Sequence, residues 1–145
     1  MLWKNNQMPP PFIFQTRIRF IDTDASGRIH YTAMFRYFES AEIEFLRTLG
    51  INYDPKRSIN FPRVHVECDF KMAMEHDDLI EIEVRVAHIG NSSVRFEFRT
   101  LKAAQLAATG IVVVVCMDRD TQRSISIPVE IRQKLALALS PDGPR

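Results

Sequence analysis

The 145 residues of this chain are enough for one domain whose hydrophobic core needs neither disulfides nor a metal. Its 19 Lys and Arg residues nearly balance its 18 Asp and Glu residues, and the net charge of +1 argues against a nucleic-acid-binding protein, which usually has a basic excess. The longest apolar run, residues 111–116, is too short to cross a membrane, and the first residues have no signal-peptide pattern. Cys68 and Cys116 then indicate buried thiols, and we expect a cytoplasmic protein.

The first half of the chain predicts a flexible segment, a strand and one long helix. Residues 1–11 are polar and rich in proline, whereas residues 12–20 alternate loosely between apolar and polar, which is typical of a strand. Residues 31–49 have helical spacing, and Gly50 follows as a stop because glycine readily adopts the left-handed conformation. The apolar stripe of this helix is formed by Met34, Phe38, Ala41, Phe45 and Leu49.

Four further strands follow a loop at residues 52–60. Residues 80–87 and 94–99 predict a hairpin around Gly90. One antiparallel register of this hairpin places Glu83 opposite Arg99 and Arg85 opposite Glu97. The strand-like runs are residues 64–71, 80–87, 94–99 and 107–117.

The last of these strands is apolar on both faces, which predicts cover on both sides, as at a subunit interface. Pro128 begins a short helix that extends through Leu139. Without repeats or low-complexity tracts, residues 1–145 form a single α+β domain, in which the simplest packing wraps the antiparallel sheet around the long helix.

The segment between the first strand and the helix, residues 22–31, is the strongest candidate for a functional site. Asp22 and Asp24 precede a glycine turn, and the free N–H groups of a helix start can hold an anion or a developing oxyanion beside them. The spacing also matches the beginning of an EF-hand calcium loop, but Ala33 stands where the closing bidentate carboxylate belongs. A third reading gives both aspartates a purely structural role in the turn or as helix caps.

The same segment resembles the opening of the 4-hydroxybenzoyl-CoA thioesterase-like hotdog proteins. The resemblance lies in residues 19–27, in the pair His30-Tyr31 and in residues 35–39. It continues through parts of the second and third strands and covers about residues 14–128. It implies the hotdog fold, in which a curled antiparallel sheet encloses a central helix, here about residues 31–49.

The resemblance also implies the chemistry and the roles of individual residues. It makes Asp24 the catalytic carboxylate, acting as nucleophile or general base in the hydrolysis of an acyl thioester. It makes the backbone N–H of Tyr31 the oxyanion donor. Many members have Tyr then His where this chain has His30 then Tyr31, but a backbone donor survives that swap. Arg28 replaces a residue that is often aliphatic in the family, and the sequence offers no account of it.

The family further implies an acyl-CoA thioesterase that needs no metal or redox cofactor, because coenzyme A is part of the substrate. Its acyl carrier is coenzyme A or acyl-carrier protein. A homodimer or homotetramer is expected, with active sites between subunits, so that Asp24 would meet residues of a partner chain.

Other polar residues are secondary candidates. His65, Glu67 and Asp69 share one strand face, which could suggest a metal but is more typical of a solvated face. By the family resemblance, His65 or Glu67 lines the pocket, and Glu39 is a reserve catalytic residue because a related subfamily uses a helix carboxylate. His30 is a further candidate for the pocket or for a reserve catalytic role. Basic residues that could contact the phosphates of coenzyme A are Arg57, Arg63, Lys71 and Arg95.

Two other functions remain open from the sequence. One is a hotdog hydratase or dehydratase acting on acyl thioesters, although the chain lacks their familiar motif. The other is a non-catalytic module that binds acyl thioesters, against which the intact Asp24 argues.

Overall fold

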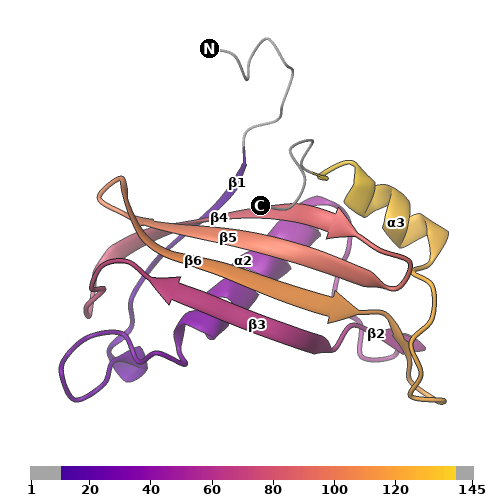
Figure 1. The fold of residues 1–145 in the computed structure, drawn as a ribbon, viewed down its shortest axis with the longest axis horizontal. Coiled ribbons are helices and arrows are strands. Elements are labelled where there is room, and N and C mark those ends of the chain that lie inside the picture. Colours follow the sequence, from indigo (N-terminus) through magenta and orange to yellow (C-terminus); the bar gives the residue numbers. More distant parts are fainter. Residues whose placement is uncertain (1–10, 140–145) are drawn as a thin grey trace, which may run out of the picture.

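The computed structural model describes residues 11–139, and one antiparallel sheet of five strands dominates them (Figure 1). The strand order across the sheet is β1-β4-β5-β6-β3. The long helix α2, Met34–Thr48, runs along one face of the sheet. The strands are β1 (Phe12–Arg17), β3 (Arg63–Phe70), β4 (Leu79–Ile89), β5 (Ser93–Lys102) and β6 (Gln105–Val115). This arrangement confirms the hotdog architecture that the resemblance implies.

Alternation along β4, β5 and β6 builds the core, as their sequences predict. Every second side chain of these strands is buried against α2, while the residues between them face outward. The predicted hairpin register is confirmed, since Glu83 pairs with Arg99 and Arg85 with Glu97. Both cross-strand pairs are also ion pairs, at 2.8 Å for Arg99 and Glu83 and 2.6 Å for Arg85 and Glu97.

The contact between α2 and the sheet centres on Phe38. Its ring stacks on Phe98 of β5 with the ring centroids 4.6 Å apart. Gly110 of β6 lies opposite Phe98, and a Cβ atom added there would overlap the ring of Phe38. The glycine therefore lets the helix approach the sheet closely.

The ends of α2 differ in how well the sequence predicts them. Gly50 has φ of +77° and donates to Arg47 O, as expected for the residue that follows a helix. The start was predicted too early, because residues 31–33 form a turn and the helix begins at Met34. The first strand was predicted too long, since β1 ends at Arg17 and a 3-10 turn, η1, occupies Phe20–Asp22.

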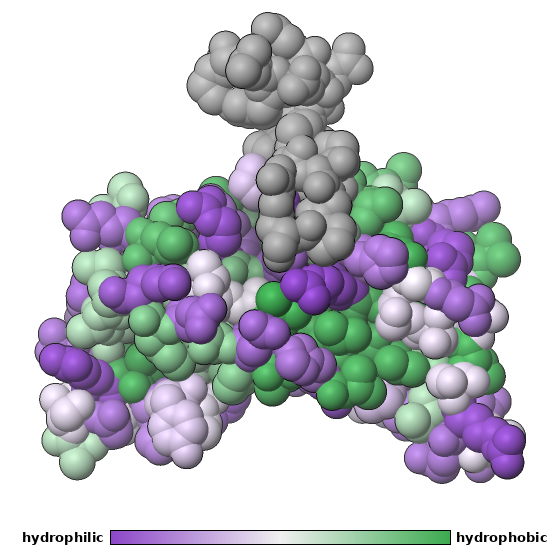
Figure 2. Space-filling model, viewed as in Figure 1, coloured by the Kyte–Doolittle hydropathy of each residue, from purple (hydrophilic) through white to green (hydrophobic). Residues whose placement is uncertain are grey.

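The two edge strands of the sheet are β1 and β3, and the last long strand, β6, lies inside the sheet. β6 lies between β5 and β3, and its outward side chains, such as Ile111 and Val113, are half-buried. Figure 2 shows hydrophilic and hydrophobic side chains interspersed on this side of the molecule. Among residues 11–139, β3 pairs only with β6, and seven of its eight residues are exposed. The interface predicted on the outward face of β6 stays a prediction, whereas the exposed edge next to it belongs to β3.

Two small elements complete the described structure. The loop predicted at residues 52–60 contains β2, Ile59–Asn60, which pairs with β7, Met117–Asp118. The terminal helix α3 spans Val129–Ala136, with Pro128 as its N-cap, and is shorter than predicted. The flexible segment predicted at residues 1–11 lies outside the described residues except for Pro11.

Candidate active site

The loop between η1 and α2 folds back on itself so that its two ends lie together. Thr23 and Ile29 form an antiparallel bridge, and the N–H of Asp24 donates to Arg28 O at 2.8 Å. Gly27, with φ of +85°, makes the tight turn, and its N–H donates to Asp24 O at 3.0 Å. Asp24 therefore has a defined backbone position at the mouth of a small hairpin-like loop.

The carboxylate of Asp24 is held through one of its oxygens. Oδ1 accepts a hydrogen bond from the Ser26 N–H at 2.8 Å and another from the Ser26 hydroxyl at 2.6 Å. No side chain among residues 11–139 donates to Oδ2. The side chain is exposed, and the two Ser26 hydrogen bonds hold its pKa below the ordinary value. Asp24 is thus an ionised carboxylate with a fixed orientation and one oxygen available to a ligand.

The backbone donor expected at Tyr31 lies at the other end of the loop. Its N–H takes part in no hydrogen bond with the described residues, whereas the N–H of His30 donates to Asp22 O at 2.8 Å. The His30 ring accepts the N–H of Thr32 at 3.2 Å and stacks on the Tyr31 ring. His30 therefore shapes the turn before α2, and Tyr31 has a backbone donor free to bind an anion.

A cavity of about 430 Å³ opens beside Asp24. Most of its wall comes from the segment that ends β3 and follows it, which the loop faces. The lining residues are Asp24, Arg28, Ile29, Tyr31, Phe70, Lys71, Met72, Ala73 and Met74. Lys71, one of the basic residues considered for a phosphate contact, does line this cavity, as does the unexplained Arg28.

The secondary candidates lie apart from Asp24 within the chain. Glu39 is about half exposed on α2, and its nearest cation is Arg63 at 3.6 Å. His65 and Glu67 pair with each other at 2.8 Å on the exposed strand β3. None of the three lines the cavity beside Asp24. Among the described residues, no group of three His, Cys, Asp or Glu side chains could hold a metal ion.

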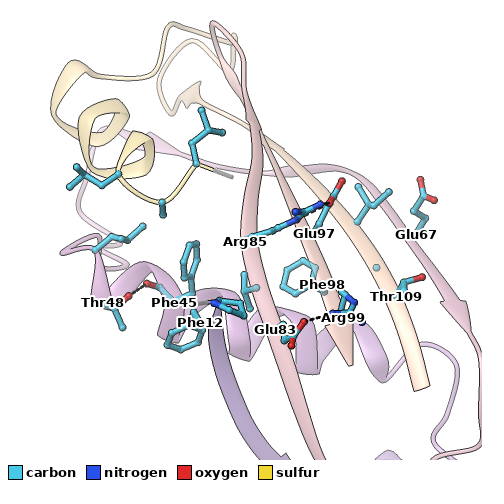
Figure 3. Close-up of a pocket in the computed structure, with 18 of the residues that line it drawn as sticks. Phe12, Phe45, Thr48, Glu67, Glu83, Arg85, Glu97, Phe98, Arg99 and Thr109 are labelled. Carbon is cyan, nitrogen blue, oxygen red and sulfur yellow. Dashed lines mark hydrogen bonds and ion pairs between the residues drawn. The ribbon is translucent and has the colours of Figure 1, made fainter. Parts of the chain in front are cut away.

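A larger cavity of about 970 Å³ has a different character (Figure 3). Phe45 and Thr48 of α2 contribute to it, together with Phe12 and the charged side chains of β4 and β5. Those charged side chains are already paired, Arg85 with Glu97 and Arg99 with Glu83. Glu67 lines this cavity rather than the one beside Asp24.

No helix in the described range 11–139 is long and apolar enough to cross a membrane.

Three contributors to the site were missed at the sequence level. Ser26 was detectable, because a hydroxyl two residues after an aspartate commonly donates to it in a turn. Arg36 and Tyr37 both bind the buried carboxylate of Asp22, Tyr37 at 2.7 Å. They lie fourteen and fifteen residues along the chain from Asp22, and nothing in the local pattern joins them to it.

Residues 18–135 match the thioesterase-like superfamily, and the chain belongs to that family. It is 31% identical over 127 residues to a candidate esterase of Aquifex aeolicus, covering 86% of this chain and 98% of the relative. It is 27% identical over 124 residues to the acyl-CoA thioesterase YbgC of Haemophilus influenzae, covering 83% of this chain and 91% of the relative. The family predicted from the loop motif is thereby confirmed.

Solved structures agree with this assignment. A hypothetical protein from Aquifex aeolicus superimposes with a TM-score of 0.81 at 28% identity, covering 86% of this chain and 99% of the other. A gentisyl-coenzyme A thioesterase superimposes with a TM-score of 0.78 at 25% identity, covering 85% and 98%. The fold and the class of enzyme are therefore those of the hotdog thioesterases.

Proposed function

We propose that this chain is an acyl-CoA thioesterase with Asp24 as its catalytic carboxylate. The observation that carries the proposal is the state of that side chain, whose Oδ1 is fixed by Ser26 and which lines a cavity. Relatives named as an acyl-CoA thioesterase and as a 1,4-dihydroxy-2-naphthoyl-CoA hydrolase support the choice of substrate class. An enzyme of this kind consumes one water and releases a carboxylate and a free thiol.

We favour a nucleophilic role for Asp24 over a general-base role because the pKa of its carboxyl group is lowered. A carboxylate whose pKa lies below its ordinary value is a weak proton acceptor at neutral pH. As a nucleophile, Oδ2 would bond to the thioester carbon, and the C–S bond would break to release a thiolate, which takes a proton from water. Water would then cleave the resulting anhydride, which frees the product acid and restores Asp24.

The developing negative charge on the thioester oxygen needs a donor, and the N–H of Tyr31 is the candidate. It has no partner among the described residues and belongs to the turn that leads into α2. The positive end of the helix macrodipole lies just beyond it. Removal of one oxyanion donor typically costs about 3–4 kcal/mol of transition-state stabilisation.

The proposal is tested with purified protein, a panel of short, long and aromatic acyl-CoAs and a thiol-trapping dye. Asp24→Asn is expected to lower turnover about 100- to 10,000-fold, since it removes the reacting oxygen. Asp118→Asn is the matched control, because Asp118 also accepts backbone N–H groups of its own turn, at 2.8 Å, outside the proposed site. If none of the substrates released a thiol, the proposed thioesterase activity would be refuted.

The site assignment has its own decisive outcome. If Asp24→Asn kept wild-type turnover while Glu39→Gln lost it, the catalytic carboxylate would be on α2 instead. Rapid acid quenching during turnover separates the two roles of Asp24. If Asp24 is the nucleophile, we expect a peptide that contains residue 24 and carries the acyl group. Product formed without any such acyl adduct would instead indicate a general base.

We also propose a homodimer joined along β3. This edge strand exposes unpaired backbone groups in the described chain, together with Val64 and Val66, which are 59% and 44% exposed. The cavity beside Asp24 begins where β3 ends, at Phe70. A second copy seated on this edge would therefore adjoin the proposed active site.

Acyl-carrier protein as an alternative acyl carrier is tested by adding its thioesters to the substrate panel.

A further inference from the structure

We propose that Asp22 is a positioning residue for the Asp24 site. Its carboxylate fastens the loop that carries Asp24 to the first turns of α2. This inference rests on the proposed function and extends it to side chains that would not touch the substrate.

The carboxylate of Asp22 has a different environment from that of Asp24. Asp22 is only 6% exposed, and both of its oxygens are occupied. Oδ1 pairs with the Arg36 guanidinium, and Oδ2 accepts the Tyr37 hydroxyl at 2.7 Å. Although burial disfavours its charged form, these two hydrogen bonds hold the pKa of Asp22 below the ordinary value. Asp22 is therefore a charged, saturated anchor with no oxygen left for substrate.

The Tyr37 hydroxyl extends this anchor to the residue that precedes η1. It accepts the backbone N–H of Arg19 at 2.9 Å, so its single proton must go to Asp22. One phenol thus joins the chain just before η1 to the carboxylate at the end of η1. The start and the end of η1, which leads into the loop, are therefore both fixed to α2.

The backbone of Asp22 fixes the exit of the loop as well. Its carbonyl accepts the N–H of His30 at 2.8 Å, and the next N–H along the chain is the unpaired one of Tyr31. Asp24 lies two residues after Asp22 at the entry. Asp22 therefore acts together with the Thr23–Ile29 bridge in setting the spacing between the proposed nucleophile and the proposed oxyanion donor. Loss of such spacing by about 1 Å can slow an enzyme roughly 100-fold.

An amide at position 22 cannot reproduce these contacts. Arg36 and Tyr37 both donate to Asp22, whereas an asparagine side chain has one acceptor oxygen and an NH₂ group. One of the two donors would then lose its acceptor while the size of the side chain stays nearly the same. Asp22→Asn thus loosens the anchor without creating a cavity.

The experiment compares Asp22→Asn and Tyr37→Phe with wild type, measuring kcat, KM and the amide hydrogen exchange of residues 22–33. Asp118→Asn is the control for a general loss of stability, since it weakens a turn at β7. We expect kcat to fall about 100-fold in Asp22→Asn with KM nearly unchanged, and exchange to quicken in the loop alone. Tyr37→Phe should change both quantities in the same direction by a smaller factor.

Wild-type kcat in a folded Asp22→Asn would overturn the inference. So would a loss of kcat equal to that of Asp118→Asn, with exchange quickened throughout the chain. If wild type hydrolysed no thioester, the proposed function would fail on its own. Hydrogen exchange would still test whether Asp22 anchors the loop. Unchanged amide exchange of the loop in Asp22→Asn would show that the side chain of Asp22 holds nothing in place.

Discussion

The stability of this protein should fall as the pH rises from 4.5 to about 7, because of Glu42. This residue of α2 is only 5% exposed, and its Oε2 accepts a hydrogen bond from Arg63 at 2.9 Å. Its other oxygen is buried without a hydrogen bond to any described group. Burial raises the pKa of Glu42 from its ordinary value of 4.5 to about 7, even though Arg63 acts in the opposite direction.

The size and sign of the effect follow from that pKa. Between pH 4.5 and 7 the folded chain keeps the proton on Glu42, whereas the unfolded chain loses it. The free energy of unfolding therefore decreases as pH rises through this window and levels off above it. At about 1.4 kcal/mol for each pKa unit, the total loss is about 3 kcal/mol. Glu42→Gln removes this dependence, because the amide stays neutral and has a similar shape.

Urea unfolding followed by circular dichroism from pH 4 to pH 8.5, at one protein concentration, measures the difference. Groups that are common to the two proteins cancel when the stability of wild type is subtracted from that of Glu42→Gln. The variant should match wild type near pH 4 and be more stable by about 3 kcal/mol near pH 8. Glu39→Gln is the control, since Glu39 faces the same Arg63 but is half exposed. A pH-independent difference, or a variant less stable at pH 8, would refute the reasoning.

Three further changes test the packing, the site and the interface. Gly110→Ala should destabilise the fold by about 1–3 kcal/mol in urea unfolding, because its Cβ would overlap Phe38; an unchanged midpoint would contradict that contact. Ser26→Ala should raise the pKa of Asp24, so the acid limb of kcat/KM should move to higher pH, and an unmoved limb would disconnect Ser26 from activity. Val66→Lys on β3 should yield a helical but inactive monomer in sedimentation and thiol assays, whereas a fully active monomer would refute a shared site.

The repetitive features of the fold could be predicted from the sequence because they are local. Alternation gave the strands of the sheet, and apolar spacing gave the helix with Phe38 and Phe45 on its buried side. The register of Arg85 with Glu97 followed from charge pairing across one hairpin. Each of these depends on residues that are close along the chain or opposite one another at a turn.

The order of the strands and the buried polar groups could not be predicted in this way. The partner of Glu42 is Arg63, twenty-one residues away, and a glutamate at that helix position looks like a surface residue in the pattern. The sequence predicts cover on both faces of β6, and the structure buries one row of its side chains while the outward row is half-buried. Composition alone does not say which neighbour covers that outward face, so the interface there stays a prediction.

The sequence motif located the proposed site, but the different roles of Asp22 and Asp24 depend on the contacts of single atoms. Asp22 and Asp24 are alike in sequence, and both have a lowered pKa. Only the structure distinguishes a carboxylate saturated by side chains of α2 from one held by a single oxygen. That distinction comes from the path of the loop, which depends on Gly27 and on the contact with α2.

A carboxylate and an oxyanion donor in open water cannot be the whole of an efficient site. Asp24 is exposed and Tyr31 is 70% exposed in the single chain, and hydrogen bonds to a developing charge are weak where water competes for it. The wall of the adjoining cavity continues directly from the open edge of β3, through Phe70 and Met72. A second copy paired along that edge would cover the cavity and lower its dielectric without moving the loop. We therefore expect the chain to supply the reacting groups and its dimer partner to supply the dry surroundings in which they act.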